Sequence, residues 1–157
     1  MQTKVIKHAM FGIVVLSLIS VDIFSPSFSE TLFYPWKIEN YAIKKPLGNF
    51  NGDAQRGRKI VINKDKGNCL ACHNLPIPEE SFHGTVGPPL QGIASRLSKG
   101  QIRLRVADEQ KVIPTTIMPG FYKDPKENNR VDDDFWGKPV LTAQEAEDVI
   151  AYLMTLK

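Results

Sequence analysis

Cysteine and histidine are scarce in this chain of 157 residues, which contains two cysteines and three histidines. Two cysteines allow one disulfide at most, and they confine thiol chemistry to a single site. An excess of charge is also lacking, because 20 lysines and arginines face 17 acidic residues and leave a net charge of +3. These basic residues are scattered among acids, which argues against a nucleic-acid partner.

Other features that the sequence lacks limit the possible folds and functions. No segment alternates apolar and polar residues for long enough to predict a β-strand. The sequence shows no internal repeat, no Gly-rich phosphate loop, no Ser/His/Asp arrangement and no paired carboxylates. A content of 42% apolar and 24% charged residues is typical of one modest globular domain. The sequence therefore predicts one all-α domain with no catalytic residues of its own.

Long apolar runs are rare, and the clearest one, residues 9–21, lies near the N-terminus. It is shorter than the roughly 20 residues that a bilayer span needs, and Asp22 follows it. The alternative of a retained membrane anchor is therefore less favoured than a secretory signal cleaved after Ser29. We expect residues 1–29 to be a signal peptide, the mature chain to be periplasmic, and membrane contact to end with cleavage. The supporting residues are the lysines before the run and the proline and small residues after it: Lys4, Lys7, Pro26, Ser27 and Ser29.

Both cysteines lie in the stretch GNCLACHNLP, where His73 directly follows the second of them. A redox-active disulfide between Cys69 and Cys72 leaves His73 without a role. A zinc site needs a fourth ligand, for which only His83 is close in sequence. The pattern C-x-x-C-H is the signature of covalent haem c attachment, which we therefore predict.

The spacing of this pattern suits haem chemistry. Two thiols add to the two vinyl groups of a haem, and two intervening residues let one turn of backbone present Cys69 and Cys72 to the same ring edge. His73 then lies next to the iron as an axial ligand. A backbone carbonyl or a carboxylate usually accepts the other N–H of such a histidine, which fixes its tautomer.

Three residues of the mature chain are candidates for the second axial ligand: Met118, Met154 and His83. Met154 falls on the predicted C-terminal helix, where methionine commonly fills the core. His83 follows His73 by only ten residues, too close to reach the opposite face of a haem easily. Met118 lies in VIPTTIMPGFY, an extended segment stiffened by prolines. We therefore predict Met118 as the ligand.

The segment TVGPPLQG is the candidate for the environment behind His73. We expect the Pro88 carbonyl to accept the hydrogen bond of the His73 ring. The alternative is that Gly87, Pro88 and Pro89 form a plain surface turn.

Apolar spacing and capping boxes predict three main helices. The first spans residues 53–61, and Gly57 in its middle implies a close crossing with another backbone. The second begins after Ser98, whose capping partner is Gln101, and the third begins after Thr142 with Glu145 as partner. The apolar stripe of the third helix consists of Ala146, Val149, Ile150, Leu153 and Leu156.

Two segments outside these helices have open interpretations. Residues 30–49 are aromatic-rich and without periodicity, so they form either an arm on their own domain or a strip that docks on a partner. Asp132 to Asp134 are interpreted as a solvated loop, with a cation or docking site as the alternative. We thus divide the chain into a signal peptide, residues 1–29, an extension, residues 30–49, and a haem domain, residues 50–157.

Five stretches together resemble a known family. The similarity covers C-x-x-C-H at residues 69–73, GPPL at 87–90, TIMP at 116–119, the C-terminal GKPVLTAQEAEDVIAYLMTLK and AIKKPL at 42–47. Their order and spacing are similar to the SoxX family, the small monohaem cytochrome c subunits of the SoxAX complexes of bacterial sulfur oxidation.

This resemblance implies a class I cytochrome c fold and a periplasmic diheme partner of the SoxA type. In that family the complex conjugates thiosulfate oxidatively to a carrier-protein cysteine, as an L-cysteine S-thiosulfotransferase. The partner carries the catalytic haem, while the present chain would accept electrons and pass them to a downstream acceptor. The main alternative is a free-standing soluble cytochrome c. A haem-based sensor would need an open axial position, against which Met118 argues.

Overall fold

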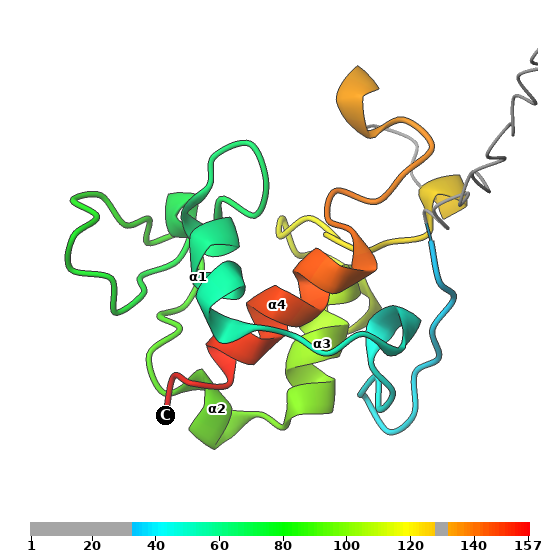
Figure 1. The fold of residues 1–157 in the computed structure, drawn as a ribbon, viewed down its shortest axis with the longest axis horizontal. Helices are drawn as coiled ribbons and strands as arrows, with labels where there is room; N and C mark the ends of the chain where they lie inside the picture. Colours follow the sequence, from blue (N-terminus) through cyan, green and yellow to red (C-terminus); the bar gives the residue numbers. More distant parts are fainter. Residues whose placement is uncertain (1–32, 128–131) are drawn as a thin grey trace, which may run out of the picture.

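The structure is a computed structural model that describes residues 33–127 and 132–157. That part holds four α-helices and no strand (Figure 1), so the all-α prediction is confirmed. None of its helices is both long and apolar enough to span a bilayer. The predicted signal peptide lies outside the described residues. The helices are α1 (Ala54–Ile62), α2 (Ile93–Arg96), α3 (Lys99–Asp108) and α4 (Ala143–Leu153), and short 3₁₀ turns occupy Leu47–Asn49, Cys69–Ala71, Glu109–Lys111, Pro125–Glu127 and Asp133–Phe135.

The three predicted helices correspond to α1, α3 and α4, and both predicted capping boxes are present. The Ser98 hydroxyl accepts from the Gln101 N–H, and the Thr142 hydroxyl accepts from the Glu145 N–H. Each cap satisfies a backbone donor that the first helical turn leaves without a partner. Helix α2, with only four residues, and the five 3₁₀ turns were not predicted, because such short elements have no apolar period.

Helices α1 and α4 pack directly against each other. A Cβ atom at Gly57 of α1 would overlap the backbone carbonyl of Asp148 in α4, so the predicted close crossing is present. The Asp148 carboxylate lies beside the crossing and accepts hydrogen bonds from the Asp53 N–H at 2.7 Å and from Arg56 Nε at 2.7 Å. Only glycine lets the two backbones approach this closely.

A buried ion pair joins α3 to α4. Arg103 Nε donates to Glu147 Oε1 at 2.5 Å and Nη2 donates to Oε2 at 2.9 Å, and the two side chains are 3% and 0% exposed. The pair also holds the segment before α1, because Arg103 Nη1 donates to the Ile43 carbonyl and the Leu47 N–H donates to Glu147. Every charge in this cluster therefore has hydrogen-bond partners, as buried charges require.

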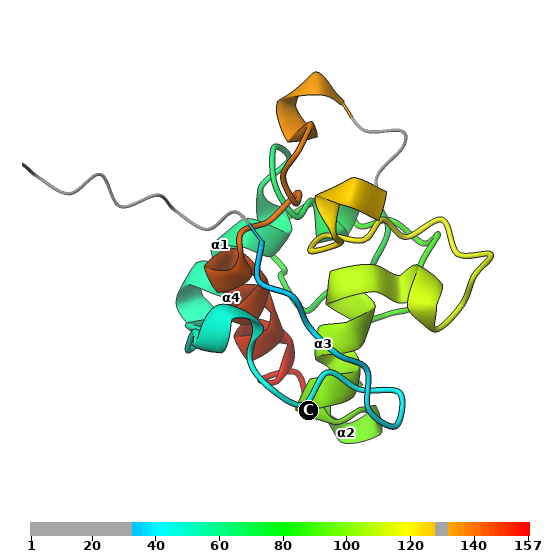
Figure 2. The same ribbon diagram turned by 90° about the vertical axis from the view of Figure 1, so that its right-hand side faces the viewer.

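The described part of the N-terminal extension folds over its own domain (Figure 2). The Tyr34 N–H donates to the Tyr122 hydroxyl at 2.6 Å, Trp36 Nε1 donates to the Tyr122 carbonyl at 3.1 Å, and the ring of Phe33 lies 5.2 Å from that of Tyr122. The aromatic residues of this extension are Phe33, Tyr34, Trp36 and Tyr41, and of these only Tyr41 is mostly exposed. The contacts favour the first interpretation of residues 30–49, an arm on its own domain.

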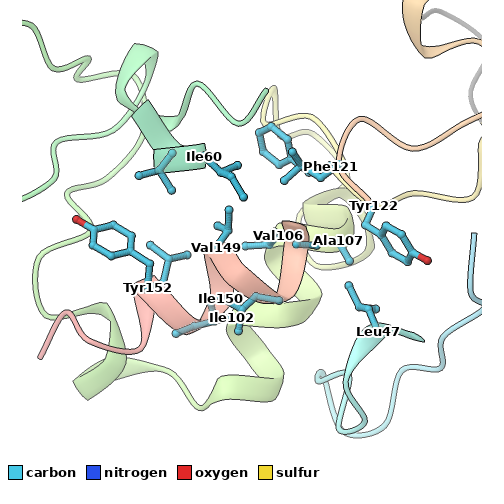
Figure 3. Close-up of a cluster of buried hydrophobic side chains, with 14 of the residues drawn as sticks. Leu47, Ile60, Ile102, Val106, Ala107, Phe121, Tyr122, Val149, Ile150 and Tyr152 are labelled. Carbon is cyan, nitrogen blue, oxygen red and sulfur yellow. The ribbon is translucent and has the colours of Figure 1, made fainter. Parts of the chain in front are cut away.

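The main core is formed by α1, α3, α4 and the segment after α3. Figure 3 shows Ile60 of α1, Val149 of α4 and Val106 of α3 near Phe121, and Ile150 of α4 beside Ile102 of α3. Asp132, Asp133 and Asp134 are exposed instead, and the Asp132 carboxylate accepts from the Asp134 N–H at 3.1 Å. Within the described ranges no cluster of three histidine, cysteine or acidic side chains could hold a metal ion. The exposure of the run agrees with the expected solvated loop, and Asp132 and Asp134 also line a cavity beside Cys69 and Cys72.

Candidate haem site

A cavity of about 980 Å³ lies between the C-x-x-C-H segment, the loop before α2 and the segment after α3. Its size is at the upper end of the range typical of cofactor sites. Cys69, Cys72, His73, Pro88 and Met118 all line it, so the structure brings the predicted site residues to one place. Helices α3 and α4 contribute apolar wall residues such as Val106 and Val149.

The local backbone explains why both thiols face this cavity. A 3₁₀ turn covers Cys69–Ala71, the Cys72 N–H donates to the Cys69 carbonyl at 3.2 Å, and the His73 N–H donates to the same carbonyl at 2.9 Å. Asn68 enters the turn in the left-handed conformation, which asparagine tolerates better than most residues. One tight turn therefore presents both sulfur atoms and the imidazole.

The thiols lack the properties of a redox-active pair. Cys69 and Cys72 are not joined in a disulfide. Burial raises the pKa of the Cys69 thiol to about 12, whereas cysteines that exchange disulfides or bind metals as thiolates have a lowered pKa. Two thiols that are not bridged to each other, beside a large apolar cavity, suit addition to the vinyl groups of a haem.

His73 is held in one tautomer. Its Nδ1 lies 2.7 Å from the Pro88 carbonyl oxygen, and a carbonyl can only accept, so Nδ1 donates the proton and the neutral imidazole has its lone pair on Nε2. The ring is 9% exposed, and a Cβ atom at Gly87 would overlap it. The loop thus fits closely around an imidazole whose Nε2 is available to a metal.

The three candidates for the second ligand lie in different environments. Met118 is half-buried and lines the cavity. His83 does not line the cavity. Both of its ring nitrogens face the backbone instead: Nδ1 accepts from the Leu75 N–H at 3.2 Å, and Nε2 lies 3.1 Å from the Glu80 carbonyl. Met154 follows α4 and packs against the core. Met118 is the only one of the three that lines the cavity.

Charged residues that the sequence did not single out also line the cavity. Arg105 pairs with Glu109 one helical turn later, and one carboxylate oxygen of Glu109 has no hydrogen-bond partner among the described residues. Burial raises the pKa of Glu109, although Arg105 lowers it in part. A guanidinium at the wall suits a ligand with carboxylates, which haem has. The i,i+4 spacing was visible in the sequence, but its position beside the cavity was not.

The cavity thus fits haem c in size, apolar lining, paired thiols and a metal-ready imidazole. Bound there through Cys69 and Cys72, the group would supply an iron that gains and loses one electron. The protein's part is to hold the ring, orient His73 and limit the access of water.

Comparison with known proteins agrees with this chemistry. The family model described as "Cytochrome c" matches residues 54–157. Seven chains among the solved structures match as well. One of them, in the crystal structure of SoxXA from P. pantotrophus, is 36% identical with a TM-score of 0.71, and the alignment covers 78% of this chain and 94% of that one.

No curated protein sequence matches the chain significantly. The structural match confirms the resemblance to the SoxX family, and the family model confirms haem c as the cofactor. Helices that surround a cavity lined by a C-x-x-C-H turn confirm the class I cytochrome fold. The chain belongs to the cytochrome c family.

Proposed function

We propose that this chain is the monohaem electron-transfer subunit of a SoxAX-type complex. It would accept electrons from a diheme SoxA-type partner during the oxidative conjugation of thiosulfate to a carrier-protein cysteine, and pass them to a downstream acceptor. The observation that carries the proposal is the match to a chain of SoxXA at 36% identity over 94% of that chain. In this assignment the chain is a non-catalytic subunit of an enzyme complex.

The use of the cysteines supports this division of labour. Cys69 and Cys72 are the only cysteines of the sequence, and both line the haem cavity. Once both sulfurs are bonded to haem, no thiol remains to hold a sulfur substrate. The sulfur chemistry would therefore belong to the partner.

We assign His73 and Met118 as the axial ligands. The Pro88 carbonyl stabilises the neutral His73 tautomer that has Nε2 free, and a thioether on the opposite face raises the reduction potential relative to a second imidazole. The segment around Met118 is anchored on both sides. The Ile113 N–H donates to the Glu109 carbonyl at 2.8 Å, and the Phe121 N–H donates to the Val106 carbonyl at 3.1 Å.

Met118→Ala tests this assignment. The oxidised holoprotein should lose the weak sulfur-to-iron absorption band, and its reduction potential should fall. Met154→Ala is the matched control, because it removes a thioether that packs on the core outside the cavity. An unchanged spectrum in Met118→Ala, or loss of the band in Met154→Ala or His83→Ala, would contradict the ligand assignment.

The partner would approach the mouth of the cavity. Val86 and Ile113 line the cavity and yet are 67% and 46% exposed. Exposed apolar side chains around a buried redox group suit a protein interface, which excludes water where the two cofactors come closest. Electron transfer also weakens steeply with distance, which favours contact at this mouth over contact at a remote surface.

Reconstitution tests the function. The purified holoprotein should take up and release electrons but conjugate no thiosulfate until the diheme partner is added. If the holoprotein conjugates thiosulfate alone, or stays monomeric in periplasmic extract that contains the diheme protein, the subunit assignment is wrong. A monomer with unimpaired electron transfer would instead identify a free-standing carrier.

A pair of variants locates the docking surface. Val86→Lys should weaken association with the diheme partner by about tenfold or more, since a charge would be buried in the interface. Tyr41→Lys changes the exposed aromatic residue of the arm and should leave association intact. The reverse result would identify the arm as the docking strip. Unchanged haem spectra in both variants are the control for correct folding.

Export and domain organisation belong to the same proposal. The haem is attached on the periplasmic side, where residues 1–29 would direct the chain. N-terminal sequencing of the mature holoprotein should begin at Glu30. A mature chain that begins at Met1 would show that the apolar run is retained as an anchor.

A further inference from the structure

The segment that carries Met118, residues 113–122, makes few hydrogen bonds along its middle. Pro114 and Pro119 have no N–H, so neither can donate a backbone hydrogen bond. The Met118 N–H donates to the Thr116 hydroxyl at 3.2 Å, which is a bond within the segment itself. Among the described residues, no helix holds the stretch between the two prolines through a backbone hydrogen bond. The position of Met118 therefore depends on how the two ends of the segment are held.

The C-terminal end of the segment is fixed to α3. The Phe121 N–H donates to the Val106 carbonyl at 3.1 Å. The Tyr122 N–H donates to the Ala107 carbonyl at the same distance. Phe121 lines the haem cavity, whereas Tyr122 is fully buried outside it, and Figure 3 shows the two rings pointing in different directions. The Tyr122 ring thus anchors the segment at a place that the haem does not reach.

The N-terminal arm makes three contacts with Tyr122. The Tyr34 N–H donates to the Tyr122 hydroxyl at 2.6 Å, which gives this buried hydroxyl a partner. Trp36 Nε1 donates to the Tyr122 carbonyl at 3.1 Å, and the ring of Phe33 lies 5.2 Å from the Tyr122 ring. The arm therefore holds both the backbone and the side chain of the residue at the end of the Met118 segment.

We propose that Trp36 is a positioning residue, which holds Tyr122 and thereby keeps Met118 on the iron. Loss of the Trp36 bond frees the Tyr122 carbonyl and lets the end of the segment move, so the thioether leaves the iron more often. With both axial positions filled, small external ligands find no open position on the iron. The arm thus keeps the distal side of the haem closed. The inference rests on Met118 as the ligand proposed above, but on no partner protein.

Replacement of Met118 by imidazole measures how often the segment opens. Added imidazole binds oxidised iron only after the thioether has left, so the binding rate at saturating imidazole is the rate of opening. Trp36→Phe keeps an aromatic ring and removes the indole N–H that donates to the Tyr122 carbonyl. Imidazole binding to the oxidised holoprotein should become about three- to tenfold faster, and the sulfur-to-iron band should disappear at the same rate.

Asp53→Ala is the matched control. The Asp53 carboxylate accepts from the Arg56 N–H at 2.8 Å at the start of α1, so its removal destabilises that helix. This cap lies outside both the arm and the Met118 segment. The variant should therefore unfold at a lower denaturant concentration and bind imidazole at the rate of the wild type. It separates a general loss of stability from release of the segment.

Faster imidazole binding in Trp36→Phe, with the wild-type rate in Asp53→Ala, supports the proposal. A wild-type rate in Trp36→Phe would overturn it, and so would an equal acceleration in both variants. A wild type without the sulfur-to-iron band would overturn the ligand assignment and this inference with it. Failure of thiosulfate reconstitution would leave the imidazole rates unchanged.

If Trp36→Phe does not mature, hydrogen exchange in the wild-type holoprotein decides. A coupling between two contacts is reciprocal, so displacing Met118 must loosen the arm by the same factor by which the arm holds Met118. Saturating imidazole should therefore speed exchange of the Trp36 indole proton about three- to tenfold, while the amide proton of Val61 in α1 exchanges as before. Unchanged exchange at Trp36, or the same acceleration at Val61, would overturn the proposal.

Discussion

The helical frame and the haem-binding loops are held together in different ways. In the frame, α1, α3, α4 and the N-terminal arm contact one another directly, through the glycine crossing at Gly57 and the buried pair Arg103–Glu147. The loops at residues 67–91 and 112–121 instead surround a cavity of about 980 Å³, and six of the chain's eleven prolines lie in them.

This difference shows which part of the chain depends on its cofactor. The frame buries its apolar side chains against its own residues. The loops present Val86, Ile113 and Ile117 to the cavity while these side chains are 67%, 46% and 80% exposed, so their burial depends on a haem in that space or on a partner at its mouth. We therefore expect the two regions to respond differently when haem, charge pairs or helix contacts are removed.

The largest effect is expected from removing both thiols. Cys69→Ala/Cys72→Ala should lose all covalent chromophore, so that any haem extracts into acidified organic solvent. Without the haem, amide protons of the loops should exchange rapidly, while those of α1 and α4 stay slower. Haem that remains with the polypeptide would contradict the attachment site, and equally fast exchange everywhere would contradict the independence of the frame.

The next largest effect should follow from breaking the buried ion pair. Arg103→Met leaves the Glu147 carboxylate buried without its cation and should lower the free energy of unfolding by about 3–5 kcal/mol. Denaturant unfolding of the holoprotein measures this. Arg103→Met/Glu147→Leu should recover part of the loss, and Lys44→Ala, at the exposed pair with Glu39, should show no measurable change. Equal losses in the exposed and buried pairs would refute this account of the frame.

A smaller loss is expected at the helix crossing. Gly57→Ala places a methyl group against the α4 backbone and should lower the free energy of unfolding by about 1–3 kcal/mol. Lys59→Ala, on the exposed side of α1, is the control and should be close to neutral. The haem spectrum should change little in either variant, because the crossing lies in the frame. A changed axial-ligand band in Gly57→Ala would show that frame and site are coupled.

The smallest effect concerns pH. Burial raises the pKa of Asp148, but hydrogen bonds from Arg56, the Asp53 N–H and Gln144 outweigh it and lower the pKa overall. A lowered native pKa stabilises the fold above the unfolded-state pKa of about 3.9, and this contribution is lost as pH falls through the native value. Unfolding between pH 6 and 2 should therefore show a shallower loss of stability in Asp148→Asn than in the wild type. Identical slopes would mean that Asp148 titrates normally.

Much of the frame could be predicted because its signals are local. The Ser98 and Thr142 capping boxes marked the starts of two helices, and the mid-helix Gly57 indicated a close crossing. The apolar stripe reached Leu156, whereas α4 ends at Leu153 and Leu156 is buried in the turn beyond it. An apolar residue at helical spacing is expected to be buried, but this pattern does not show whether the residue lies in the last helical turn or in a packed segment after it.

Other contacts had no local signal. Arg103 and Glu147 are 44 residues apart, and charged residues in a sequence are normally expected at the surface. The Tyr122 hydroxyl accepts from the N–H of Tyr34, 88 residues away in sequence, and this contact favours an arm on its own domain over a free strip. Arg96 is exposed, as most cations are, and nothing local in the sequence predicts that its guanidinium donates to the Pro89 carbonyl of the loop behind His73.

The sequence by itself determined the cofactor chemistry, because within five residues local backbone geometry alone can bring two thiols to one haem edge and an imidazole to the iron. It also determined the helical class, since capping and apolar period act over a few residues. Only the tertiary structure decided which methionine lines the cavity, which charges are buried and which carbonyl meets His73. Those relations join residues far apart in the chain, and close packing around a shared cofactor brings them together.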